Sequence, residues 1–75
     1  MTHKKVYETF KDLFNVEDEE VSVWFQNGLN SIRVRNQNRV EFVFTYENDH
    51  DWVLETAEHF LKRLESNLKG DKNND

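Results

Sequence analysis

Carboxylates are the most concentrated reactive groups in this 75-residue sequence, whose formal net charge is −5. Residues 41–58 contain six acids and neither lysine nor arginine. On a helix, carboxylates one turn apart are separated by about 5.4 Å, which resembles the spacing of phosphates along a nucleic acid. Such a row could occupy a basic groove that normally holds DNA or RNA. Compensation of a helix dipole and solubility explain at least half of these charges without a partner. The acids we single out are Glu41, Glu47, Asp49, Asp51 and Glu55.

Other groups that could support catalysis are sparse. Glu55 and His59 are four residues apart and would be neighbours on a helix, as in half of a metal or acid–base site. No third ligand is positioned by the sequence, so a surface pair is the simpler interpretation. The chain has no cysteine and only two glycines, and it contains no phosphate-binding loop. We therefore expect no catalytic residue, no metal, no cofactor and no enzymatic activity.

The first half of the chain predicts a helix followed by a hairpin. Residues 3–14 carry apolar side chains at helical spacing, and Thr2 is a suitable N-cap. The acidic run 17–20 is expected to be a loop, because adjacent like charges repel. Residues 21–26 alternate as a strand, and Asn27-Gly28 is a strong signal for a two-residue turn. This turn would pair Trp24 with Ser31 and place Trp24 away from the core.

The second turn follows from which side chains must share a face. A three-residue loop at 36–38 would pair Val34 with Val40 and would set Arg33 opposite Glu41. Asn38 would then take the left-handed position of the loop, and Asn36 would begin it. The third strand would run over residues 40–46, with Phe42 and Phe44 facing the core.

A second helix is expected over residues 50–69, capped by Asn48 or Asp49. Its apolar stripe would be Val53, Ala57, Phe60, Leu61, Leu64 and Leu68, with exposed pairs at Glu58–Lys62 and Glu65–Lys69. Gly70 would end it. The predicted fold class is α+β, an αβββα domain over residues 1–70 in which both helices cover one face of a three-stranded antiparallel meander. A disordered polar tail would follow over residues 71–75.

The uncovered sheet face would display Trp24 and Arg33, residue types that are frequent at binding hot spots. Trp24 stacked on the Arg33 stem, as simple cover for the sheet, is the alternative. The element order is that of double-stranded RNA-binding domains, which hold RNA with lysines at the start of the second helix. Here that segment is acidic, so we expect no direct binding of nucleic acid.

Three segments together resemble a known group of proteins. They are Ile32-Arg33-Val34-Arg35-Asn36, Glu41-Phe42-Val43-Phe44-Thr45 and the helix ending Phe60-Leu61-Lys62. This arrangement resembles small proteins of Gram-positive phages and prophages, among them αβββα anti-CRISPR inhibitors of the type II RNA-guided nuclease. The resemblance implies that acidic and amide side chains occupy the DNA-reading site of the nuclease. The matching positions are Asn36, Asn38 and Glu41, whereas the arginine-rich second strand departs from that pattern.

Together these features predict a small acidic protein-binding module of the cytoplasm, monomeric or homodimeric. It would inhibit a host protein, such as a nuclease, by blocking a basic surface that handles nucleic acid. The alternative is a structural or regulatory module that self-associates through its open sheet face. No segment is apolar enough to predict a membrane span.

Overall fold

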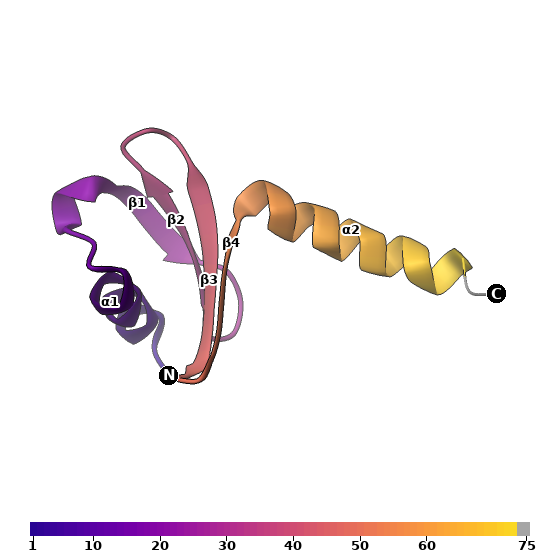
Figure 1. The fold of residues 1–75 in the computed structure, drawn as a ribbon, viewed down its shortest axis with the longest axis horizontal. Coiled ribbons are helices and arrows are strands. Elements are labelled where there is room, and N and C mark those ends of the chain that lie inside the picture. Colours follow the sequence, from indigo (N-terminus) through magenta and orange to yellow (C-terminus); the bar gives the residue numbers. More distant parts are fainter. Residues whose placement is uncertain (74–75) are drawn as a thin grey trace.

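A computed structural model shows an α+β fold in which one helix precedes and one helix follows the four strands of an antiparallel sheet along the chain (Figure 1). It describes the backbone of residues 1–73 and the side chains of residues 1–66. The elements are α1 (His3–Phe14), a 3-10 turn η1 (Asp18–Glu20), β1 (Val21–Gln26), β2 (Ser31–Asn36), β3 (Glu41–Asn48), β4 (Asp51–Thr56) and α2 (Ala57–Asn73). The strands lie in sequence order, β1-β2-β3-β4. The α+β class is thus confirmed, whereas the expected sheet of three strands is wrong.

Helix α1 forms as its sequence predicts. The Thr2 hydroxyl accepts a hydrogen bond from the Lys5 amide at 3.1 Å, and Asn15 ends the helix in a left-handed conformation with φ of 54°. The buried stripe of α1 consists of Val6 and Phe10. It packs on one sheet face against Ile32, Val34, Phe44 and Tyr46. This aromatic-rich layer between α1 and the sheet is the core.

The predicted pairing of β1 with β2 is wrong by three residues. Trp24 lies opposite Val34 rather than Ser31, and a loop longer than the expected two-residue turn joins the strands. Gly28 has a φ of 99° and Asn30 a φ of 53°, so the left-handed positions are not adjacent. An odd shift reverses the faces of the β1 side chains from Val23 to Gln26, whereas Val21, beyond the register irregularity, stays on the core side. Trp24 therefore points toward α1 and stacks on Tyr7, with ring centroids 4.7 Å apart.

The pairing of β2 with β3 differs from the prediction by two residues, which preserves the faces. Val34 pairs with Phe42, and Arg33 pairs with Val43 instead of Glu41. The Asn36 side-chain oxygen accepts hydrogen bonds from the amides of Asn38 and Val40, which shapes the loop. The left-handed residue of this loop is Arg39, with φ of 66°, and not Asn38.

Residues 51–56, expected as the first turns of a helix, form β4 instead. Leu54 pairs with Phe44 and Trp52 with Tyr46, so both extend the apolar face of the sheet. Helix α2 follows without a loop, and the Thr56 hydroxyl accepts a hydrogen bond from the His59 amide at 3.1 Å. The helix continues through Gly70 to Asn73. The side chains of the predicted stripe residue Leu68, of Lys69 and of the entire predicted tail 71–75 lie outside the described residues.

The prediction that both helices cover one face is also wrong. Figure 1 shows α1 on one side of the sheet and α2 projecting from the opposite side. The physical reason is the absence of a connector: β4 uses the residues that would have let α2 turn back over the apolar face.

Candidate protein-binding site

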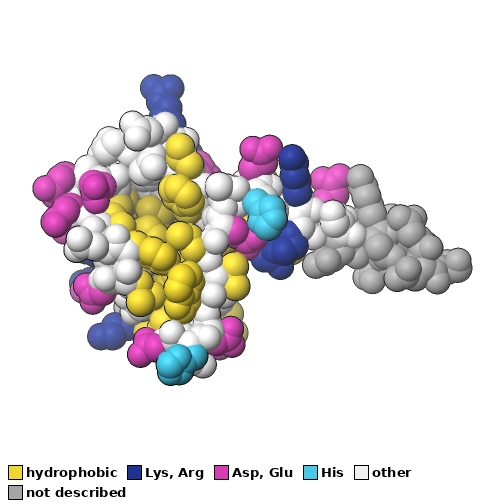
Figure 2. All heavy atoms as spheres, in the orientation of Figure 1, with side chains coloured by type: hydrophobic (Ala, Val, Ile, Leu, Met, Phe, Trp, Pro, Cys, Tyr) yellow, Lys and Arg dark blue, Asp and Glu magenta, His cyan; other side chains and the backbone are white. Residues whose placement is uncertain are grey.

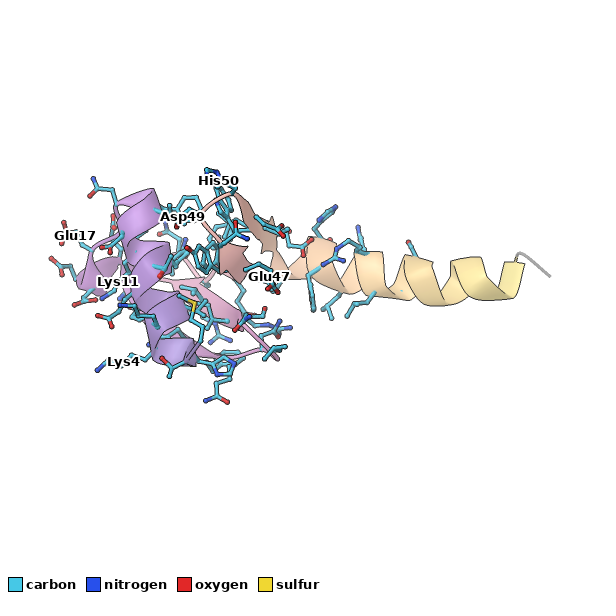
Figure 3. The ribbon with its side chains drawn as sticks, turned by 90° about the horizontal axis from the view of Figure 1, so that it is seen from below. Lys4, Lys11, Glu17, Glu47, Asp49 and His50 are labelled. Atoms are coloured by element: carbon cyan, nitrogen blue, oxygen red, sulfur yellow. The ribbon has the colours of Figure 1, made fainter. Side chains whose placement is uncertain are left out.

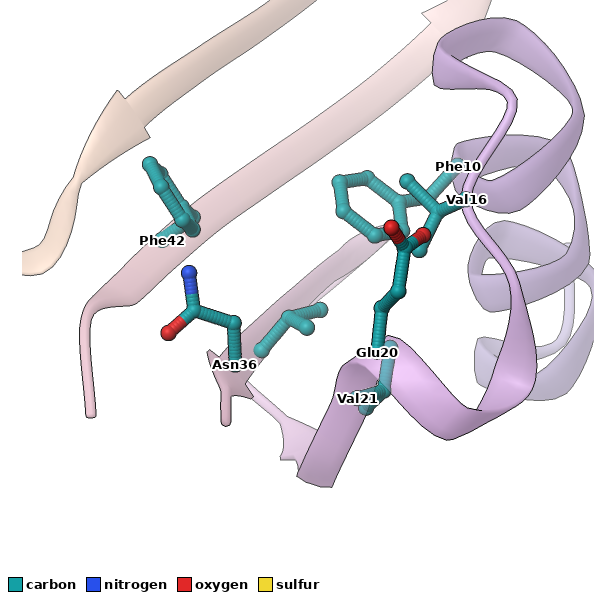
Figure 4. A pocket seen from close by; sticks show the side chains of 7 residues that line it. Phe10, Val16, Glu20, Val21, Asn36 and Phe42 are labelled. Atoms are coloured by element: carbon teal, nitrogen blue, oxygen red, sulfur yellow. The ribbon is translucent and has the colours of Figure 1, made fainter. Parts of the chain in front are cut away.

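The apolar face of the sheet is only partly covered by α1, and a groove remains beside that helix. We call it the α1-side groove; it has a volume of about 200 Å³ and is lined by Phe10, Val16, Glu20, Val21, Val34, Asn36 and Phe42 (Figure 4). A β-bulge between Val21 and Val23 turns Val21 toward this groove. The floor is therefore built by three strands and the wall by α1 and the segment that follows it.

Aromatic rings extend the apolar surface beyond the groove. Phe14 contacts Trp52 edge-on at 5.2 Å, and both rings also lie against Phe44. Trp52 remains 38% exposed because α2 does not cover it. Figure 2 shows the apolar side chains gathered in one hollow of the surface. Phe44 itself is fully buried, so Trp52 and the partly exposed Phe14 are what this cluster presents to a partner; exposed aromatic side chains beside an apolar groove are frequent in protein-binding sites.

The rim of the α1-side groove is acidic. The turn η1 and its preceding residue contribute four consecutive carboxylates, residues 17–20. Glu20 accepts a hydrogen bond from the Glu17 amide at 2.8 Å, which fixes its position at the rim. Asp18 alone is ion-paired in this turn, with Lys11 at 2.6 Å, and this contact raises the pKa of Lys11. The rim thus presents negative charge beside apolar surface.

The opposite side of the sheet, which we call the open sheet face, carries Arg33, Glu41, Val43 and Thr45. The expectation that all four are displayed to water is wrong for Val43, which is fully buried. Glu41 is held by both neighbouring arginines, at 3.6 Å from Arg33 and 2.6 Å from Arg35. Because β1 is reversed, Val23 and Phe25 take the place of Trp24 on this face. The Arg33 guanidinium lies over the Phe25 ring at 5.9 Å. Ion pairs therefore neutralise much of this surface.

Glu55 fixes the start of α2. Its side chain is only 7% exposed, and its carboxylate accepts hydrogen bonds from Arg63 at 2.7 Å and His59 at 2.9 Å. The Arg63 guanidinium is the main cause of a Glu55 pKa below the usual value, opposed by burial and assisted by His59. We call these three residues the Glu55 clamp. The expected Glu55–His59 pair thus exists, and it holds a helix against a strand.

Helix α2 leaves most of its apolar stripe uncovered. Leu61 is 53% exposed and Leu64 is 42% exposed, while Phe60 is half-buried under the Arg63 guanidinium. Among the described side chains of α2, residues 57–66, only Ala57, where the helix leaves the sheet, is buried. An amphipathic helix exposed in this way lacks the packing that normally stabilises it.

The remaining predicted acids lie at the tip of the β3–β4 hairpin. Glu47, Asp49 and Asp51 are exposed there, and Figure 3 labels Glu47, Asp49 and the neighbouring His50. Tyr46 donates a hydrogen bond to Asp49, which raises the pKa of the tyrosine. The helical row expected to include Asp51 and Glu55 does not form, because both lie in β4. Glu41 and Glu55 are ion-paired on the sheet. Asn36 is the last residue of β2 and Asn38 lies in the β2–β3 loop, apart from the hairpin tip.

Sequence reasoning missed Val16, Val21 and Phe42 as lining of a groove, and Trp52 as an exposed ring beyond it. The alternation of Trp52 and Leu54 with Val53 and Glu55 is a strand signal that could have revealed β4. It was obscured because Asp49 and Asp51 also suit the first turn of a helix.

Across the described part of the chain, no three histidine or acidic side chains meet in a way that could hold a metal ion. None of the described helices is long and apolar enough to cross a membrane. Comparison with family models, with curated proteins and with solved structures found no match to this chain.

Proposed function

We propose that this chain is a protein-binding module that receives an amphipathic helix in its α1-side groove and performs no catalysis. The observation that supports the proposal is the uncovered apolar surface of the sheet, including the cavity of about 200 Å³ beside α1. An apolar groove that accepts the apolar stripe of a helix is a common mode of recognition. Binding would remove Phe42 and Trp52 from water.

The acidic rim favours a particular kind of helix. Residues 17–20 carry four carboxylates, of which only Asp18 has an ion-pair partner among the described side chains. A partner helix with lysine or arginine beside its apolar stripe would complement this rim, and a helix flanked by acids would be repelled. The proposed ligand is therefore a basic amphipathic helix.

A selection of helical peptides displayed on phage and captured by the immobilised protein tests this proposal. We expect captured peptides to carry apolar residues at helical spacing with basic neighbours. Val16→Lys, which places an ammonium in the groove, should abolish their binding. Val23→Lys is the matched control, because it makes the same change on the open sheet face. Peptides that bind Val16→Lys as well as the native protein would refute the groove as the site.

The acidic hairpin tip supports a second candidate function, obstruction of a basic surface that handles nucleic acid. Its supporting observation is that Glu47, Asp49 and Asp51 are exposed and join no ion pair among the described side chains. The resemblance to anti-CRISPR proteins makes the type II RNA-guided nuclease the first partner to assay. Inhibition of DNA cleavage that is lost in the triple amide variant, E47Q/D49N/D51N, would support this function. Cleavage unaffected by the native protein would refute it for that nuclease.

A further inference from the structure

We infer that the helix received by the α1-side groove is α2 of a second copy, so that two copies exchange their α2 helices. This inference rests on the proposed function and names its partner. It starts from two exposed surfaces in one chain: an apolar groove without a helix and an apolar helix without a groove.

The α2 helix cannot fill the groove of its own chain. It follows β4 directly, and Thr56 is at once the last strand residue and the N-cap of the helix. The Glu55 clamp then ties the first two turns of the helix to β4 through Arg63 at 2.7 Å and His59 at 2.9 Å. Figure 1 shows that α2 consequently leaves the sheet on the side opposite α1. The groove is thus available to another helix only.

The chemistry of α2 matches what the groove requires. Phe60, Leu61 and Leu64 form an apolar stripe, and the 17-residue helix is about 25 Å long. Residues 62–72 contain four basic residues against two acidic ones; Arg63 is held by Glu55 of its own chain, which leaves three basic residues for a partner. Packed in the groove of a second copy, this segment would lie near the four carboxylates of residues 17–20. The apolar stripe and the charge balance both favour this occupant.

The exchange is also closed and symmetric. Each copy gives one helix and receives one, so both exposed surfaces are covered and none remains to extend the assembly. A stable interface buries at least about 1,200 Å² in total. Phe42, Trp52 and Phe60 are already partly buried and can contribute only their remaining exposed area, so the more exposed Leu61 and Leu64 and the polar rim must supply the rest of the interface.

Sedimentation velocity of the full chain, from low to high micromolar concentration, tests the inference. We expect a dimer for the native protein. Leu64→Lys on the helix and Val16→Lys in the groove should each weaken dimerisation at least about tenfold, because each places a charged side chain in the apolar contact, where its desolvation opposes association. The controls are Leu29→Lys, at a loop residue that is 84% exposed, and Val23→Lys on the open sheet face. Both controls should remain dimeric, and circular dichroism should show that all four variants are folded.

A mixture of the two disruptive variants distinguishes exchange from other dimers. The groove of Leu64→Lys is intact and so is the helix of Val16→Lys, so one of the two contacts can form in the mixed dimer. We expect the equimolar mixture to regain dimer that neither variant forms alone.

Other outcomes would overturn the inference. A native chain that stays monomeric excludes exchange; if helical peptides still bind the groove, the proposed function survives with a different partner. If neither dimer nor peptide binding is seen, both fail. A dimer that persists in Leu64→Lys and Val16→Lys but dissociates in Val23→Lys would place the interface on the open sheet face.

Discussion

Glu55→Gln tests whether the Glu55 clamp fixes the direction of α2. The substitution preserves the shape of the side chain and removes its charge. In the native chain the carboxylate accepts hydrogen bonds from Arg63 at 2.7 and 3.3 Å and from His59 at 2.9 Å. The amide oxygen of glutamine can still accept a hydrogen bond from Arg63, but its amide nitrogen, itself a donor, would face another donor where a carboxylate oxygen now accepts.

The expected loss follows from the burial of Glu55. Hydrogen bonds to a charged group contribute about 1.5–3 kcal/mol when they are shielded from water. Glu55 is 7% exposed, but Arg63 is 48% exposed, so we expect the lower part of that range. A loss of about 1.5–2 kcal/mol in the free energy of unfolding corresponds to about 6–16 °C in Tm for a domain of this size.

Urea unfolding followed by tryptophan fluorescence measures this loss, with Glu58→Gln as the matched control. Glu58 pairs with Lys62 at 3.4 Å on the surface of the same helix and is 79% exposed. Its substitution should change stability by less than about 0.5 kcal/mol. Equal effects of the two substitutions would refute the clamp.

The pH dependence gives an independent check. Because the folded state lowers the pKa of Glu55, its stabilising effect is complete above the pKa of the unfolded chain, about 4.3. It decreases as the pH falls through the lower pKa of the folded state. The stability difference between native protein and Glu55→Gln should thus be constant from pH 7 to about 5 and shrink in more acidic solution. A difference that grows toward acid pH would contradict the assigned ion pair.

Three further substitutions test the fold and the groove. Trp24→Ala should cost about 2–4 kcal/mol in urea unfolding, because Trp24 stacks on Tyr7 under α1; a cost near zero would restore Trp24 to the open sheet face. Arg39→Gly should stabilise the chain by about 0.5–1 kcal/mol in the same assay, since Arg39 has a φ of 66°; destabilisation would contradict that loop conformation. Glu20→Gln keeps the hydrogen bond to the Glu17 amide and should weaken binding of basic helical peptides with little effect on Tm; unchanged affinity would refute a role for the acidic rim.

The sequence allowed a good prediction of α1 and of the faces of β2 and β3. These depend on local patterns: the Thr2 cap, the helical spacing of Val6 and Phe10, and the alternation around Phe42 and Phe44. The predicted β2–β3 register was off by two residues, yet an even shift leaves each side chain on its face. Arg33 and Glu41 are therefore still in contact, but diagonally across β2 and β3 instead of directly opposite each other.

The β1 register could not be deduced in the same way, because Asn27-Gly28 is compatible with more than one loop length. Both faces of β1 carry large apolar residues, with Trp24 on one and Val23 and Phe25 on the other. The alternation alone thus did not indicate which face of β1 lies toward the core. The fold shows that it is the face of Trp24, which stacks on Tyr7.

The candidate site was predicted least well because it depends on β4. The segment 51–56 satisfies both a helical stripe through Val53 and a strand alternation through Trp52 and Leu54. Pairing with β3 resolves the choice in favour of the strand, since Leu54 then lies against Phe44. This single change separates the predicted acids, releases α2 from the apolar face and leaves the groove open.

Paramagnetic relaxation between two copies tests the central claim most directly. The chain has no cysteine, so a Ser66→Cys variant carries a single spin label on α2. It is mixed with an unlabelled ¹⁵N copy, and only contacts between copies then broaden the ¹⁵N signals. The account predicts broadening of the amides of Val16, Val21 and Phe42 around the α1-side groove. Broadening confined to Val23 and Phe25 on the open sheet face, or none at all, would contradict it.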